Sequence, residues 1–191
     1  QHIKREKATS NICTAQALLA TMAGFYAVYH GPEGIRTIAE RIHSIAVFLE
    51  ESINRLGYKQ VNAQYFDTLR FALPDTISAQ QIRTIALSKE VNLRYFKNGD
   101  VGMSIDETTD ITAVNVLLSI FAIAAGRDWE KASDVPMASS ISAEMKRQST
   151  YLTHEVFNKY HTETEMMRYI KRLDRKDISL AHSMISLGSC T

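Results

Sequence analysis

Histidines, cysteines and small hydroxyl residues are the side chains in this sequence with the chemistry for catalysis or metal binding. His154-Glu155 begins a zinc-protease pattern, but Asn158 stands where the second histidine of His-Glu-x-x-His belongs. The histidines are otherwise spread along the chain, and His154 and His161 are the two closest together. Because no tight group of His, Cys and Asp residues occurs, we expect no metal site.

A second set of reactive side chains lies near the end of the sequence. It combines an imidazole, hydroxyls and a thiol in His182, Ser183, Ser189, Cys190 and Thr191. These groups either line a polar site or complete the hydrogen bonds of a tight turn, and both interpretations stay open. P-loop, Gly-x-Ser-x-Gly and Gly-x-Gly-x-x-Gly patterns do not occur in the sequence. The residues alone therefore indicate no self-sufficient active site.

The composition is that of an ordinary globular protein, with 191 residues, 45% hydrophobic and 23% charged. A net charge of +1 gives no basic surface for nucleic acid, so we expect no nucleic-acid partner. Cys13 and Cys190 match no Cys-x-x-Cys pattern and are expected to be free thiols.

One long stretch, between Lys7 and Glu33, carries no charged residue. Its larger apolar residues recur at three- and four-residue steps, which predicts one face of a buried helix with Leu19 in the core. The part without strongly polar residues, 17–29, would rise about 20 Å as a helix, too short for a bilayer of about 30 Å. We therefore expect a core helix on which the rest of the chain packs, and no membrane span.

The elements that follow predict an α+β fold. Gly31-Pro32 breaks the first helix, and an apolar stripe from Ile35 to Leu56 predicts a second, long amphipathic helix. Alternating residues predict strands at about 67–73, 91–95 and 101–105, with a shorter extended piece at 59–63. Asn98-Gly99 predicts a two-residue hairpin turn, and helices are expected at about 78–89 and 111–126. The result is a small antiparallel sheet backed by helices.

The remainder of the sequence changes in character. Residues 127–150, rich in serine with Pro136, predict a linker over the surface. From Tyr151 the chain is richer in aromatic residues, and Thr162-x-x-Glu165 is a capping box for a helix. The organisation expected is a domain at 1–126, a linker at 127–150 and a helical extension at 151–191.

Three runs of residues resemble the P-proteins of the glycine cleavage system, the decarboxylating glycine dehydrogenases. They are Arg5-Glu-Lys-Ala-Thr-Ser-Asn-Ile-Cys-Thr-Ala-Gln-Ala-Leu-Leu-Ala20 continued by Tyr26-Ala-Val-Tyr-His-Gly-Pro-Glu-Gly34, Tyr151-Leu-Thr-His-Glu-Val-Phe-Asn-Lys-Tyr-His-Thr-Glu-Thr-Glu165, and Lys176-Asp-Ile-Ser-Leu-Ala-His-Ser-Met-Ile-Ser-Leu-Gly-Ser-Cys-Thr191. The likeness covers nearly the whole chain without a long gap. In the last run the family usually has proline where this chain has Ser186, which frees one φ angle.

The resemblance implies a fragment of a fold-type I pyridoxal phosphate enzyme, of α/β class overall, built from two related halves. Residues 1–126 resemble the small C-terminal domain of the first half, 127–150 the connection and 151–191 the truncated start of the second half. The lysine that holds the cofactor is expected beyond Thr191, so no catalytic residue and no bound cofactor are expected here. His182, Ser183, Ser189, Cys190 and Thr191 are expected near the cofactor or substrate.

The resemblance also implies partners for the full enzyme. It would decarboxylate glycine on pyridoxal phosphate and pass the aminomethyl group to the lipoyl arm of the H-protein. A homo-oligomer is expected, in the cytoplasm of a bacterium or the mitochondrial matrix of a eukaryote. The alternatives are a standalone α+β interaction or oligomerisation module, or the small domain of another fold-type I enzyme.

Overall fold

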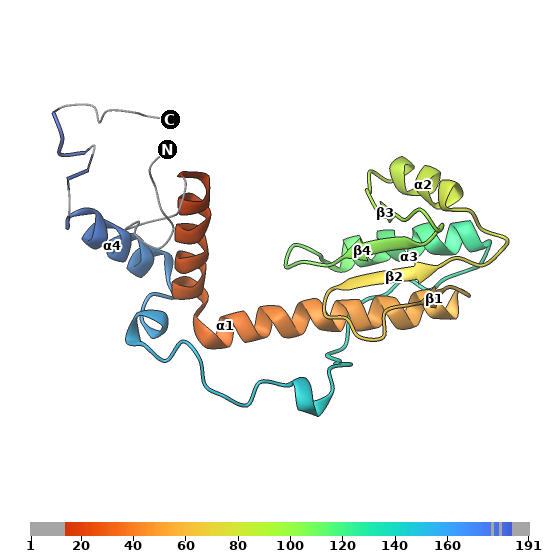
Figure 1. Ribbon diagram of the computed structural model, residues 1–191, viewed down its shortest axis with the longest axis horizontal. Helices are drawn as coiled ribbons and strands as arrows, with labels where there is room; N and C mark the ends of the chain where they lie inside the picture. The colour runs from red at the N-terminus through yellow and green to blue at the C-terminus, as the bar shows by residue number, and fades with distance from the viewer. Residues whose placement is uncertain (1–13, 177, 180, 185–191) are drawn as a thin grey trace, which may run out of the picture. The chain divides into compact units, whose positions relative to one another are not determined.

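The structure, a computed structural model, describes residues 14–176, 178–179 and 181–184 (Figure 1). The chain forms two compact units, one made of residues 1–35 with 149–191 and the other of residues 36–148. None of the helices within the described ranges is both long and apolar enough to cross a membrane.

The first element, α1, runs from Thr14 to Arg55 and bends sharply at Gly31. Gly31 has φ 63° and ψ −176°, far from helical values, and Pro32 follows it with no N–H to donate. The predicted break between two helices is therefore confirmed. A side chain at position 31 would be strained both by the positive φ and by lack of space, because an added Cβ would lie 2.6 Å from the carbonyl oxygen of Phe157.

A four-stranded antiparallel sheet forms the centre of the 36–148 unit. Its strands lie in the order β1, β2, β4, β3, so the two longer strands are central. Their bounds are Lys59–Gln60 for β1, Thr68–Ala72 for β2, Arg94–Tyr95 for β3 and Val101–Ser104 for β4. In the central pair, Leu69 is opposite Met103, and both side chains are buried. The predicted small antiparallel sheet is confirmed.

The hairpin between β3 and β4 is also confirmed, but its turn is longer than the two residues predicted. The N–H of Phe96 donates to the carbonyl oxygen of Asp100 at 2.9 Å, and the N–H of Gly99 donates to the carbonyl oxygen of Phe96 at 3.0 Å. Residues 97–99 thus form the turn, and Gly99 takes the positive φ of 91°. Within the turn, the side-chain amide of Asn98 donates to the carboxylate of Asp100 at 2.9 Å.

Helices α2, Ala79–Ser88, and α3, Ile111–Ala125, complete the unit with the second part of α1. Ser78 and Asp110 accept hydrogen bonds from backbone N–H groups in the first turns of α2 and α3, as N-caps do. The core between sheet and helices contains fully buried side chains from every layer: Leu49, Ile53, Leu69, Phe71, Ile82, Val101, Ile120 and Phe121. This is an α+β fold.

The N-terminal part of α1 differs from the sequence prediction. Leu18, Leu19 and Met22 are 63%, 64% and 58% exposed, so the expected burial of Leu19 is wrong for this chain. The spacing did place these residues on one helix face, but nothing in the described part of the 1–35 and 149–191 unit covers it. Further along the same part of α1, Phe25 meets Tyr169 of α4, Glu163–Asp174, edge to face at 6.2 Å. Periodicity identifies a face for burial and says nothing of what lies against it.

Candidate functional site

His182 and Ser183, two of the predicted cofactor-binding residues, lie in a turn after α4. The backbone N–H groups of both residues donate to the carbonyl oxygen of Ser179, and Ser179 Oγ lies 3.0 Å from His182 Nδ1. His182 is exposed. Ser189, Cys190 and Thr191 lie outside the described residues.

The turn is electrostatically linked to the end of α4. A hydrogen bond from Lys171 lowers the pKa of Asp174 below its usual range, and a bond from Ser179 and the charge of His182 act in the same direction. Asp174 therefore stays ionised.

His154 and Glu155, which begin the zinc-protease pattern, both make local structural contacts. His154 Nδ1 accepts the N–H of Val156 at 3.1 Å and caps a short 3-10 helix, Glu155–Asn158. Glu155 pairs with Lys159 at 2.7 Å, and this hydrogen bond lowers the pKa of Glu155. Within the described residues, no group of three or more His, Cys, Asp or Glu side chains is placed to hold a metal ion.

The bend in α1 forms a joint with residues 151–161, which the sequence analysis did not foresee. His161 Nδ1 lies 2.7 Å from the carbonyl oxygen of Tyr29, and the hydroxyl of Tyr151 donates to the carbonyl oxygen of Pro32 at 2.6 Å. A bend frees helix carbonyls from their usual partners, and these side chains supply new donors. The signal was present in the sequence, because Gly31-Pro32 predicts unpaired carbonyls nearby.

Aromatic side chains extend this joint along α4. The rings of Tyr160 and Tyr169 stack at 4.3 Å, and the guanidinium of Arg172 lies 5.6 Å and 5.3 Å from their centres. Arg172 also donates to the hydroxyl of Tyr160 at 2.7 Å. These contacts fix α4 in the 1–35 and 149–191 unit and leave Phe25 as its link to α1.

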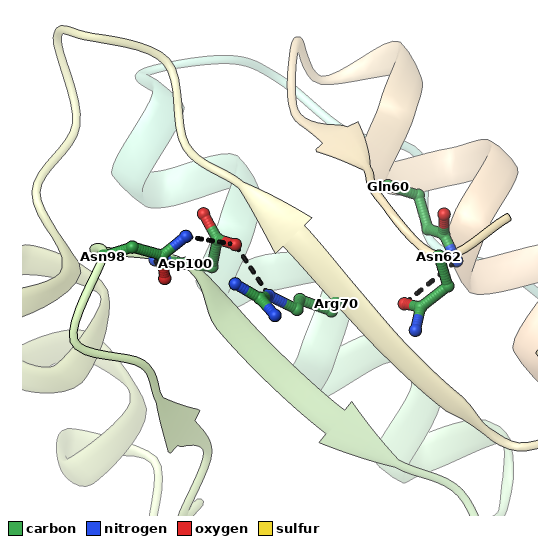
Figure 2. Close-up of polar contacts among 5 residues, drawn as sticks. All are labelled: Gln60, Asn62, Arg70, Asn98 and Asp100. Atoms are coloured by element: carbon green, nitrogen blue, oxygen red, sulfur yellow. Dashed lines mark hydrogen bonds and ion pairs between the residues drawn. The ribbon is translucent and has the colours of Figure 1, made fainter.

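The sheet carries a polar cluster on the face that does not pack on the helices. Figure 2 shows Arg70 and Asn98 converging on the carboxylate of Asp100, at 2.7 Å and 2.9 Å. The guanidinium of Arg70 also lies over the ring of Phe96 at 4.3 Å. Phe96 in turn needs Gly102 beneath it, since an added Cβ there would approach its ring to 2.9 Å. Because its cation and its anion are paired with each other, we interpret the cluster as a structural contact that holds the β3–β4 hairpin to β2.

A cavity of about 590 Å³ lies in the 36–148 unit, between α1, α3 and residues 127–134. Phe48, Leu56 and Leu118 give it apolar walls. Its remaining walls mix cations and anions, namely Arg55, Arg127, Asp128, Glu130, Lys131 and Asp134, with Trp129 and small residues between them. The charges of opposite sign balance, so the cavity has no preference for an anion or a cation. It includes neither His182 nor Ser183.

Comparison with known proteins agrees with the resemblance seen in the sequence. The family model described as "Glycine cleavage system P-protein" matches residues 1–121. Proteins named "Glycine dehydrogenase (decarboxylating)" are 82% identical in Bacteroides fragilis, 79% in Bacteroides thetaiotaomicron and 51% in Flavobacterium johnsoniae, over all 191 residues of this chain. The chain spans 20% of the length of each of these curated relatives. It belongs to the glycine cleavage system P-protein family.

Proposed function

We propose that this chain is the part of a decarboxylating glycine dehydrogenase that joins its two halves. The observation that carries the proposal is 82% identity, over the full chain, to a protein of that name. In the parent enzyme, residues 1–126 would be the last domain of the first half. Residues 127–150 would link the two halves, and residues 151–191 would be the start of the second half. The joint between Tyr29 and His161 supports this reading, because it ties the proposed second half to the proposed first half.

The parent enzyme would release the carboxylate of glycine and transfer the remaining aminomethyl group to the lipoyl arm of the H-protein. Pyridoxal phosphate, when bound, supplies an electron sink for loss of the carboxylate. From this chain, the imidazole of His182 and the hydroxyl of Ser183 would hold and orient the bound groups, with Ser189, Cys190 and Thr191. We assign the lysine that holds the cofactor to no position in this chain.

The chain alone is therefore proposed to be inactive. The 191-residue protein, mixed with pyridoxal phosphate and then gel-filtered, should keep no cofactor absorbance and should not release carbon dioxide from glycine. A borohydride-stable adduct mapped to a lysine within residues 1–191 would overturn this. The parent enzyme, in contrast, should lose activity on His182→Ala, and His154→Ala, an exposed histidine in the same unit, serves as the matched control.

A second candidate function is favoured by one observation, the exposed apolar residues Leu18, Leu19 and Met22. They suit an interaction module that binds a partner protein and works without further domains. Sedimentation of the isolated chain separates the two functions. A stable monomer with residues 151–176 resistant to protease would support the independent module, whereas frayed residues or self-association through this face would support the enzyme fragment.

The cellular setting and assembly of the parent follow from the same proposal. The relatives that the chain matches are bacterial, which supports a cytoplasmic parent enzyme. A homo-oligomer is also proposed for the parent, with glycine and the lipoylated H-protein as its partners. Light scattering of the full-length enzyme and its binding to lipoylated H-protein test these assignments directly.

A further inference from the structure

Residues 127–140 form a strap without regular secondary structure that crosses the 36–148 unit. Buried polar side chains hold it at three points. Asn115 donates to the carbonyl oxygen of Ala132 and accepts its N–H, both at 2.9 Å. Ser44 Oγ accepts the N–H of Ala138 at 3.1 Å. The third point is His43, which holds Ser140 at the end of the strap.

The hydrogen bonds of His43 select one form of its ring. Nδ1 lies 2.8 Å from the carbonyl oxygen of Phe66, and a carbonyl only accepts, so Nδ1 carries the proton. Nε2 receives the backbone N–H of Ser140 at 3.0 Å, so Nε2 is unprotonated. The ring is therefore neutral, in a single tautomer. It is only 2% exposed, and it stacks on the ring of Phe66 at 5.4 Å.

A second proton on His43 would break this arrangement. Nε2–H would face the N–H of Ser140, donor against donor, and Ser140 Oγ at 3.3 Å would be the remaining acceptor. The imidazolium would also lose hydration in a buried site, where an unpaired charge is costly.

The surrounding groups do not supply a compensating negative charge in contact with the ring. Tyr65, 5.8 Å from His43, donates its hydroxyl to Glu50, and burial followed by this bond raises the pKa of Tyr65 to about 12, so it stays neutral. From the same loop, Asp67 is half-buried, and its carboxylate accepts from the hydroxyl of Thr68. On α1, Glu40 is exposed and meets Ser44 through its backbone oxygen. From the strap, Ser140 meets the ring, and its side chain also bonds with Tyr65.

We propose that His43 is a proton-sensitive latch for the end of the strap. In its neutral form the ring binds the N–H of Ser140 and holds the end of the strap. Protonation removes that acceptor, releases Ser140 and weakens the adjacent contact between Ser44 and Ala138. Residues 138–140 then join the segment 141–148 that follows them, so a longer part of the connecting chain is no longer held to the unit.

Amide hydrogen exchange in the isotope-labelled 191-residue protein tests the latch. Between pH 8 and pH 5, after correction for the intrinsic rate, protection of the Ser140 amide should fall at least about tenfold. Protection at the amide of Leu49, in the same unit, should stay constant. Unchanged protection of the Ser140 amide across this pH range would overturn the proposal.

Two variants sharpen the result. His43→Gln keeps an acceptor near the position of Nε2 but cannot titrate, so protection at Ser140 should become independent of pH. Ser140→Ala removes the acceptor left to a protonated ring, so the release at pH 5 should be larger. Ser142→Ala is the matched control, because Ser142 is exposed and makes no capping bond, and it should behave as the unchanged protein. The same pH dependence in His43→Gln as in the unchanged protein would refute the role of this histidine.

Discussion

His161 binds the carbonyl oxygen of Tyr29 through Nδ1 at 2.7 Å, across 132 positions of sequence. Since the carbonyl only accepts, Nδ1 carries a proton in this bond. Tyr151 makes the equivalent bond to Pro32 on the other side of Gly31. The bend of α1 is thus held by two residues of the 149–191 segment, and these bonds help make 1–35 and 149–191 one compact unit.

Replacing Gly31 should disrupt this joint. In Gly31→Ala the new Cβ would meet Phe157 O at 2.6 Å and His161 Cε1 at 2.7 Å, at a φ of +63°. Strain of this kind costs about 1–3 kcal/mol, which thermal unfolding should show as a lower Tm. Gly24→Ala is the matched control. Gly24 is helical with open space around it, so alanine there should raise stability by about 0.5–1 kcal/mol. Equal effects of the two substitutions would contradict the joint.

The two parts of α1 should respond differently to loss of a leucine. Leu19 is 64% exposed, so Leu19→Ala should change the free energy of unfolding by less than about 0.5 kcal/mol. Leu49 is fully buried, and Leu49→Ala should cost about 2–5 kcal/mol. Urea unfolding of the two variants provides the comparison. A large loss in Leu19→Ala would mean that this face is covered in solution.

Asn115, a residue of α3, should stabilise the protein by holding the strap at Ala132. Asn115→Ala leaves the N–H and the carbonyl of Ala132 without their partner, at a cost of about 1–3 kcal/mol. The gain in helix propensity offsets this by roughly 0.5 kcal/mol. Trp129, the single tryptophan, lies in the strap and should show a red-shifted emission in this variant. Asn62→Ala removes an exposed amide and should leave both readouts unchanged.

Stability should fall in alkaline solution because of Tyr58. This phenol donates to the carbonyl oxygen of Phe121, and burial, opposed by the charge of Arg127, raises its pKa to about 12 from 10.0. Between these values the folded protein binds more protons than the unfolded chain, so the free energy of unfolding decreases as pH rises. The contribution is complete below pH 10, and about 2 kcal/mol is lost across the window.

Urea unfolding between pH 9 and pH 11.5 measures this slope. Tyr58→Phe should make it shallower, and Tyr65, whose pKa is also raised to about 12, accounts for a remaining part. Tyr26→Phe removes an exposed phenol and is the matched control. An unchanged slope in Tyr58→Phe would contradict the assignment of alkaline sensitivity to this residue.

Local elements were determined by the sequence to a large extent. Thr162 caps a helix as expected, Ser78 and Asp110 cap two others, Gly31-Pro32 breaks α1, and alternating residues form β2 and β4. These features depend on interactions within a few residues, so their signal is contained in short segments. The family could also be recognised from the sequence, because the residues that identify it are consecutive in the chain.

What only the tertiary structure decided are contacts between distant residues. The polar side chains of His43, Ser44 and Asn115 interrupt apolar helix faces, and their partners lie up to 97 positions away in the strap. Leu19 shares its periodicity with buried residues but lies on a face without cover in the described chain. Periodicity tells which face of a helix can be buried, whereas burial itself requires a partner surface, and that partner is chosen by the fold as a whole.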